Sequence, residues 1–159
     1  MDVNSGNKNP RGQTRAQGQR VGFNEEELRN EIKEKLGDNY VDNILNFTNL
    51  ESEKFINMIN KIKDFIGELT QDRDITSTKM RKIYELIKKS NSLNQLLLQI
   101  PYLAYMVGRE TSIRSKNELG KIYIIFKDVI EEAKDDVHIY NIKKFAEALV
   151  AYQKYYEEG

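Results

Sequence analysis

The chain has 159 residues, with 25 Lys and Arg against 25 Asp and Glu, one His and no Cys, so its formal charge at neutral pH is zero. This balance argues against a uniformly basic nucleic-acid coat protein or an acidic tail, and the absence of Cys excludes disulfides, zinc ribbons and thiol catalysis. A chain of this length fits one domain that buries a core without such cross-links.

Residues 1–22 form the first segment and are almost free of large apolar side chains. They hold four Gly and many Asn and Gln, a composition that cannot offset the entropy of ordering the chain. We predict a flexible, disordered basic arm without a hydrophobic leader. Its Arg11, Arg15 and Arg20 either make transient phosphate contacts or only aid solubility.

Helical periodicity begins at Asn24, which forms a capping box with Glu27. Apolar stripes at spacings of three and four predict helices over residues 24–36, 52–69, 77–90, 93–109, 118–133 and 137–156, with a short helix or ordered connector over 40–47. Apolar–polar alternation never persists, so we expect no strands. The sequence predicts an all-α fold, a compact five- or six-helix bundle that forms a single domain over residues 23–159.

The uncharged run of residues 90–108 is long enough to raise the question of a membrane span. It contains four Asn and Gln residues and Pro101, which are costly in hydrocarbon. We therefore predict a buried helix of a soluble, cytoplasmic protein with no membrane contact. The ring of Pro101 removes a backbone donor, so this helix should kink or restart there.

Catalytic residues are sparse. His138 is the only histidine, so one chain cannot build a Ser-His-Asp arrangement or a His-rich metal site. The acids Glu131, Glu132, Asp135 and Asp136 would suit a metal-dependent helical nuclease, although a solvated charge run at a helix end is the simpler interpretation. No Gly-rich phosphate loop is present. We predict that the chain is not an enzyme and uses no metal or cofactor.

Charge is segregated along the chain despite its overall neutrality. Residues 73–121 contain ten basic and four acidic residues, whereas residues 23–72 contain six and twelve, and residues 122–159 contain five and eight. A neutral protein with this pattern can still carry a strong local positive field. The middle segment is therefore where we expect an anionic partner.

The predicted helix over residues 77–90 is amphipathic. Helical projection gathers four cations opposite its apolar residues, namely Arg81, Lys82, Lys88 and Lys89. Such a row suits phosphates, although many solvated helices look alike. Thr76 and Ser77 place hydroxyl and free N–H groups at the positive end of the helix dipole, and Lys79 adds a cation there.

A second group of cations follows the apolar helix. Its members are Arg109, Arg114, Lys116 and Lys121. If the bundle brings this connector beside Thr76, the two groups form a single positive patch. Tyr84, Tyr102 and Tyr105 either stack on bases or belong to the core.

Three blocks in the chain resemble one protein family. They are residues 74–84 (DITSTKMRKIY), 96–109 (LLLQIPYLAYMVGR) and 145–156 (FAEALVAYQKYY). In this order they resemble the small subunit of type III-A CRISPR effector complexes, the Csm complexes. The likeness covers about residues 74–156.

The resemblance implies a non-catalytic, RNA-binding subunit of an antiviral ribonucleoprotein. Several copies would stack along the duplex of guide RNA and target RNA, beside backbone subunits and a large multidomain subunit. The positions that it assigns to the RNA backbone are Thr76, Ser77, Lys79, Arg81, Lys82 and Arg109. Guide pairing would supply sequence choice, so contacts to phosphates and 2′-hydroxyls suffice. The alternative is a helical protein–protein adaptor whose basic face docks an acidic partner.

Overall fold

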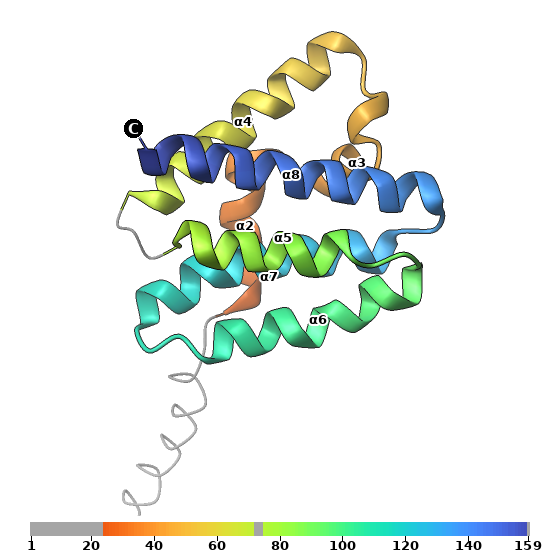
Figure 1. The fold of residues 1–159 in the computed structure, drawn as a ribbon. Helices are drawn as coiled ribbons and strands as arrows, with labels where there is room; N and C mark the ends of the chain where they lie inside the picture. The colour runs from red at the N-terminus through yellow and green to blue at the C-terminus, as the bar shows by residue number, and fades with distance from the viewer. Residues whose placement is uncertain (1–23, 72–74, 159) are drawn as a thin grey trace, which may run out of the picture.

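The computed structural model describes residues 24–71 and 75–158, and the predicted arm of residues 1–22 lies outside them. The described residues form an all-α bundle without strands, as predicted (Figure 1). Its α-helices are α2 (Glu25–Leu36), α3 (Tyr40–Leu45), α4 (Ser52–Thr70), α5 (Ser77–Lys88), α6 (Leu93–Gly108), α7 (Ile113–Glu132) and α8 (Asp136–Glu158). A 3-10 helix, η1 (Phe47–Asn49), follows α3, so the predicted connector is helical.

The two longest helices, α7 and α8, organise the bundle. Helix α8 packs against α4 and α5, α7 packs against α6 and α2, and the short α3 contacts both. Helices α8, α5 and α6 lie side by side on the face toward the viewer in Figure 1, with α7 and α2 behind them. One face of the molecule is therefore built from three helices, with α5 in the middle.

Aromatic side chains from three elements pack against one another in the core. The ring centroid of Phe145 on α8 lies 5.7 Å from that of Phe126 on α7 and 6.1 Å from that of Phe47 on η1. Beside them, the buried Asn141 accepts the backbone N–H of Thr48 at 3.0 Å and donates to the carbonyl of Leu45 at 2.7 Å. These paired polar groups fix α3 and η1 to α8 without leaving a buried amide unsatisfied.

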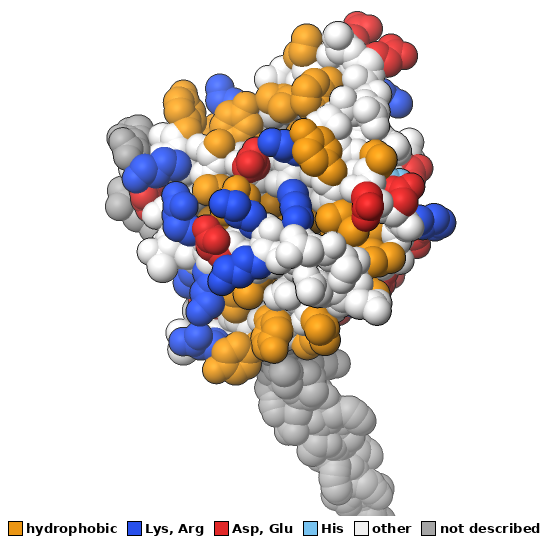
Figure 2. Space-filling model, turned by 45° about the vertical axis from the view of Figure 1, so that its right-hand side comes forward, with side chains coloured by type: hydrophobic (Ala, Val, Ile, Leu, Met, Phe, Trp, Pro, Cys, Tyr) orange, Lys and Arg blue, Asp and Glu red, His pale blue; other side chains and the backbone are white. Residues whose placement is uncertain are grey.

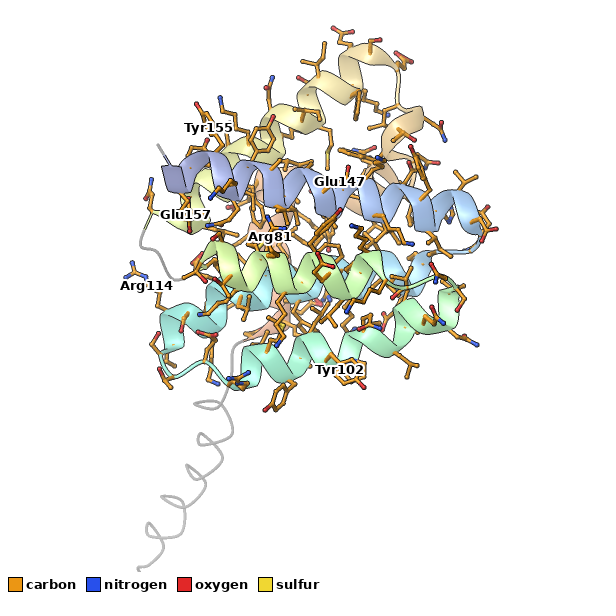
Figure 3. All side chains as sticks on the ribbon, in the orientation of Figure 1. Arg81, Tyr102, Arg114, Glu147, Tyr155 and Glu157 are labelled. Atoms are coloured by element: carbon orange, nitrogen blue, oxygen red, sulfur yellow. The ribbon has the colours of Figure 1, made fainter. Side chains whose placement is uncertain are left out.

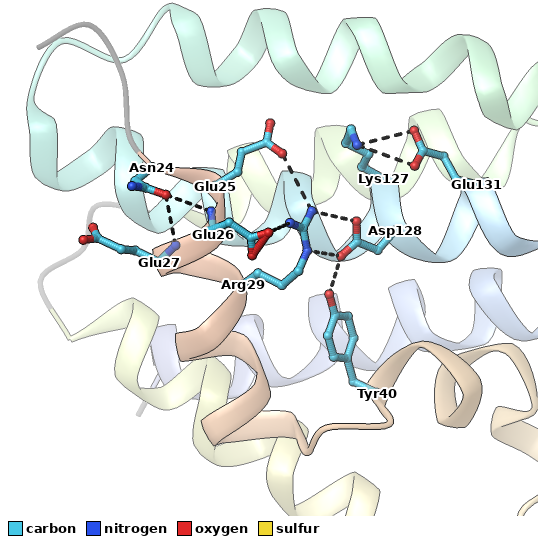
Figure 4. Close-up of polar contacts among 9 residues, drawn as sticks. All are labelled: Asn24, Glu25, Glu26, Glu27, Arg29, Tyr40, Lys127, Asp128 and Glu131. Atoms are coloured by element: carbon cyan, nitrogen blue, oxygen red, sulfur yellow. Dashed lines mark hydrogen bonds and ion pairs between the residues drawn. The ribbon is translucent and has the colours of Figure 1, made fainter. Parts of the chain in front are cut away.

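A polar network attaches the first helices to α7 (Figure 4). Arg29 on α2 donates from Nε and Nη2 to the two carboxylate oxygens of Asp128 on α7, at 2.8 and 3.0 Å. The hydroxyl of the buried Tyr40 on α3 also donates to Asp128. Burial and the bond to Asp128 raise the pKa of Tyr40, and the same carboxylate raises the pKa of Arg29. The bidentate pair therefore joins α2, α3 and α7.

Helix α6 differs from the predicted buried helix. It runs through Pro101 as one element, and Pro101 lies on the solvent side. The opposite face is buried through Leu96, Leu103 and Met106. Proline removes one backbone hydrogen bond of the helix, and the packing of the buried face offsets this loss. In the part of the chain that the structure describes, no helix has the length and apolar character needed to cross a membrane.

Helix α7 begins at Ile113, five residues before the predicted start. Ser112 caps it by accepting the N–H of Ser115 at 3.0 Å. The first turn holds Ser115 as its buried residue, so the apolar stripe used to locate the helix starts only later. As a result, Arg114 and Lys116 belong to the helix rather than to a connector.

Candidate nucleic-acid interface

Helix α5 separates a buried apolar side from an exposed basic side. Its N-cap Thr76 accepts the N–H of Lys79 at 3.2 Å, and Met80, Ile83 and Ile87 are buried against the bundle. The four cations predicted to face outward are all exposed, namely Arg81, Lys82, Lys88 and Lys89. Figure 2 shows Lys and Arg side chains gathered on this face, with single acidic side chains between them.

Helix α8 adds a cation to this face. Tyr84 on α5 donates to Oε2 of Glu147 on α8 at 3.4 Å, and Lys144 donates to Oε1 of the same carboxylate at 3.3 Å. The Nζ of Lys88 lies 5.6 Å from the centroid of the Tyr84 ring. The bond to Glu147 also raises the pKa of Lys144. Lys144 was missed in the sequence because it lies in a segment with net negative charge, although its spacing from Tyr140 and Glu147 places it on one helix face.

The connector after α6 lies beside the start of α5, as the single-patch hypothesis requires. The Nζ of Lys79 is 2.9 Å from Oε1 of Glu110, whose side chain is only 13% exposed. Arg109 is exposed and lies over the ring of Tyr105, 5.6 Å from its centroid. Lys116 donates to the carbonyl of Gly108 at 3.1 Å. Glu110 therefore neutralises part of the charge that Lys79 brings to this end.

Two further cations of this group lie differently. Arg114 projects from the first turn of α7, at the end of the bundle where α5 begins (Figure 3). Lys121 is two turns further along α7, and its Nζ lies 2.9 Å from Glu31 on α2 and 3.6 Å from Glu118. Lys121 faces α2, on the acidic side of the bundle. The expectation that it clusters with Arg109 is wrong, because the helix that starts at Ile113 turns it away.

The start of α5 is less open than the sequence suggested. The backbone N–H of Ser77 points at Oε2 of Glu157 on α8, at 3.4 Å. A carboxylate at this place complements the positive end of the helix dipole. An anion bound to Thr76 and Ser77 would have to displace Glu157, so these two residues are weaker candidates than the exposed cations of α5.

Helix α6 borders the basic face with exposed apolar side chains. Leu98, Tyr102 and Tyr105 are 61%, 57% and 64% exposed and follow one another at spacings of four and three. Figure 3 shows Tyr102 on the outer edge of α6. These tyrosines are not core residues, in contrast to Tyr84, which is half-buried.

Of the acids near His138, Asp135 accepts a backbone N–H in the first turn of α8, and Glu131 pairs with Lys127 on α7. The backbone N–H of His138 donates to Asp135 at 2.9 Å, and its Nδ1 accepts the N–H of Lys134 at 3.0 Å. Among the described residues, no group of three His, Asp or Glu side chains is placed to hold a metal ion. These contacts belong to the connector between α7 and α8.

A family model described as Csm2 Type III-A matches residues 52–159. The match begins at the first residue of α4, so it extends the resemblance seen in the sequence by one helix and leaves α2, α3 and η1 outside it. No curated protein and no solved structure shows a significant match.

Proposed function

We propose that this chain, which belongs to the Csm2 Type III-A family and is a small subunit of a type III-A CRISPR complex, binds the RNA backbone through the exposed face of α5. Several copies would lie along the duplex of guide RNA and target RNA, each contributing a few contacts. The subunit would act without catalysis, and in the cytoplasm.

The row of cations on α5 is the observation that carries this proposal. Arg81 and Lys82 lie about two turns from Lys88 and Lys89 on the side of the helix that faces away from the core. Guanidinium and ammonium groups on such a row can reach successive phosphates without reading bases. Lys144 widens the row onto α8. Backbone contacts of this kind suit a subunit in a complex where guide pairing selects the target.

The remaining candidates have supporting roles in this proposal. Arg114 lies near the start of α5, and Arg109 directly precedes Glu110, which pairs with Lys79 there. In this proposal both extend the positive surface. Lys79 is already paired with Glu110, so its net contribution to RNA affinity is smaller than that of an exposed cation. Lys121 has no role in this proposal, since its Nζ lies 2.9 Å from a carboxylate oxygen of Glu31 on α2.

A single copy should bind RNA weakly. Four neutralised phosphates on single-stranded RNA give a log–log slope of affinity against salt of roughly −3. Copies held side by side convert such weak contacts into strong retention through effective concentration. The acidic surface of α2 then faces neighbouring chains or solvent.

The RNA affinity of a variant whose α5 face has lost its positive charge tests the proposal. The α5 variant replaces four cations with Gln: Arg81, Lys82, Lys88 and Lys89. The matched control makes the same change at four exposed lysines away from this face: Lys33, Lys54, Lys61 and Lys134. Fluorescence anisotropy with single-stranded RNA of unrelated sequences should show a loss of at least about tenfold for the α5 variant and little change for the control.

Three results would count against this assignment. Full affinity in the α5 variant would exclude the face, and equal losses in both variants would show that only net charge matters. Binding of an acidic polypeptide such as poly-glutamate, in the absence of RNA binding, would favour the adaptor alternative.

A further inference from the structure

A cavity of about 750 Å³ lies at the end of the bundle where α4 and α8 finish and α5 begins. Its wall includes side chains from α4 and α8 and from Ile75 and Thr76, which directly precede α5, and it is separate from the row of cations on α5. Figure 3 shows Glu157 at this end of α8, next to the start of α5. Nothing in the proposed contacts to RNA uses this cavity.

The wall is rich in hydrogen-bond acceptors. Asp64 and Glu68 on α4 and Glu157 on α8 supply carboxylates, and Thr70 and Thr76 supply hydroxyls. None of the described residues that line it is Lys or Arg. Glu68 is paired with Lys35, which approaches from α2 at 2.7 Å, whereas Asp64 makes no ion pair with any described residue.

Gln153 gives independent support for a ligand. It lines the cavity, the residue is only 3% exposed, and its Oε1 has no hydrogen-bond partner among the described residues. A buried amide oxygen in this state is costly and uncommon. A donor group that enters the cavity would satisfy it.

We propose that this cavity binds a guanidinium group, the side chain of an arginine presented by another protein chain of the complex. Guanidinium is planar, carries five donors and accepts no hydrogen bond, which suits a wall of carboxylate, hydroxyl and amide oxygens. The described acids are not grouped to hold a metal ion. An extended cation with several donors therefore fits this cavity better than a single ion does.

Tyr156 adds a flat surface for such a ligand. It lines the cavity and lies so close to Gly67 that a Cβ at that position would come within 2.9 Å of its ring. The absence of a side chain at Gly67 thus allows the ring of Tyr156 to pack against α4. Arginine stacks on aromatic rings more readily than lysine does.

Titration of the full chain with L-arginine amide tests this site without RNA, so its failure would leave the proposed function intact. Nitrogen–proton correlation spectra should show saturable shifts for the side-chain amide of Gln153 and the backbone amide of Ser77. Lysine amide should bind at least about threefold more weakly than arginine amide, because it presents fewer donors.

Two substitutions and one control make the titration specific. Asp64→Asn and Gln153→Met should each weaken the binding of arginine amide about threefold or more, because each removes an acceptor. Glu53→Gln, which removes an exposed carboxylate of α4 outside the cavity, should leave it unchanged. Absence of saturable shifts, or equal affinity for lysine amide, would overturn the guanidinium assignment.

A separate experiment identifies which chain supplies the arginine. The titration is repeated with Arg73→Ala, since Arg73 lies between the cavity residues Gln71 and Ile75 in the sequence. Binding seen only with that substitution would show that the chain's own arginine takes the site. In the reconstituted complex, Asp64→Asn with Gln153→Met should reduce incorporation of this subunit about threefold or more, while Glu53→Gln does not. Unchanged incorporation would overturn the assignment to another chain.

Discussion

Replacing Arg81 and Lys82 with Ala removes half of the exposed cations of α5 and leaves its buried side intact. Both side chains are exposed, and the helix is held by Met80, Ile83 and Ile87 on the other side. Alanine favours the helix at least as well as the residues that it replaces. The change should therefore act on RNA affinity and not on folding.

The size of the effect follows from the number of phosphates that α5 can neutralise before and after the substitution. With four cations on α5 the slope of log affinity against log salt for single-stranded RNA is roughly −3, and with two it is roughly −1.4. If the non-electrostatic part of binding is unchanged, the loss of two contacts lowers affinity about tenfold at about 0.15 M salt and less at higher salt.

The assay is fluorescence anisotropy with labelled single-stranded RNA over a series of salt concentrations. The control is Lys33→Ala with Lys54→Ala, which removes two exposed cations from α2 and α4. Thermal unfolding checks that both variants fold. An unchanged slope in the α5 variant, or the same change in the control, would refute the reasoning that the face of α5 carries the phosphate contacts.

Four other predictions concern stability and the limits of the interface. Asp128→Ala should lower the free energy of unfolding in urea by about 2 kcal/mol, because Arg29 and the hydroxyl of Tyr40 lose their shared acceptor. Arg29 keeps longer pairs with Glu25 and Glu26, and its pair with Asp128 is 21% and 15% exposed, so the loss is smaller than that of a fully buried pair. A loss below about 0.5 kcal/mol would mean that the network is not a structural link. The pKa of Tyr40 is raised above its ordinary value of 10.0, so the folded state holds this proton more tightly and stability falls as the pH rises above that value; Tyr40→Phe should remove this part of the pH dependence, and identical profiles would contradict it. Gln153→Met should raise the free energy of unfolding by about 1 kcal/mol, because it removes an unsatisfied buried oxygen, and a decrease would show that the amide is satisfied in solution. Lys121→Ala should change RNA affinity by less than about twofold, and a larger loss would return it to the interface.

The helices were predictable where an apolar stripe met a cap. Asn24, Thr76 and Ser92 each accept backbone N–H groups at a helix start that the pattern located within a residue or two. Helix α7 was placed too late because its first turn is polar and includes the buried Ser115. Hydropathy cannot mark such a turn, since the burial of a hydroxyl depends on its cap partner and not on its own polarity.

The face of α6 shows what composition cannot settle. Its residues are mostly apolar, so the sequence predicted a buried helix. In the bundle α6 packs mainly on α7, and Leu98, Tyr102 and Tyr105 remain exposed. Only the arrangement of neighbouring helices decides how many sides of an apolar helix are covered.

The candidate interface was predictable in its centre and not at its edges. Periodicity alone placed Arg81 and Lys88 outward, because their own helix decides this. Lys144 and Lys121 depended on packing between distant segments, which brought the first to α5 through Glu147 and turned the second toward Glu31. Ion pairs between helices cannot be read from spacing within one helix.

Lysine footprinting in the assembled complex tests the central proposal most directly. The complex is reconstituted with guide RNA, and its lysines are acetylated with and without complementary target RNA. The account predicts that Lys82, Lys88 and Lys89 are protected when RNA covers α5, while Lys33 and Lys54 react equally in both states. Protection confined to Lys33 and Lys54, with the lysines of α5 unchanged, would contradict it.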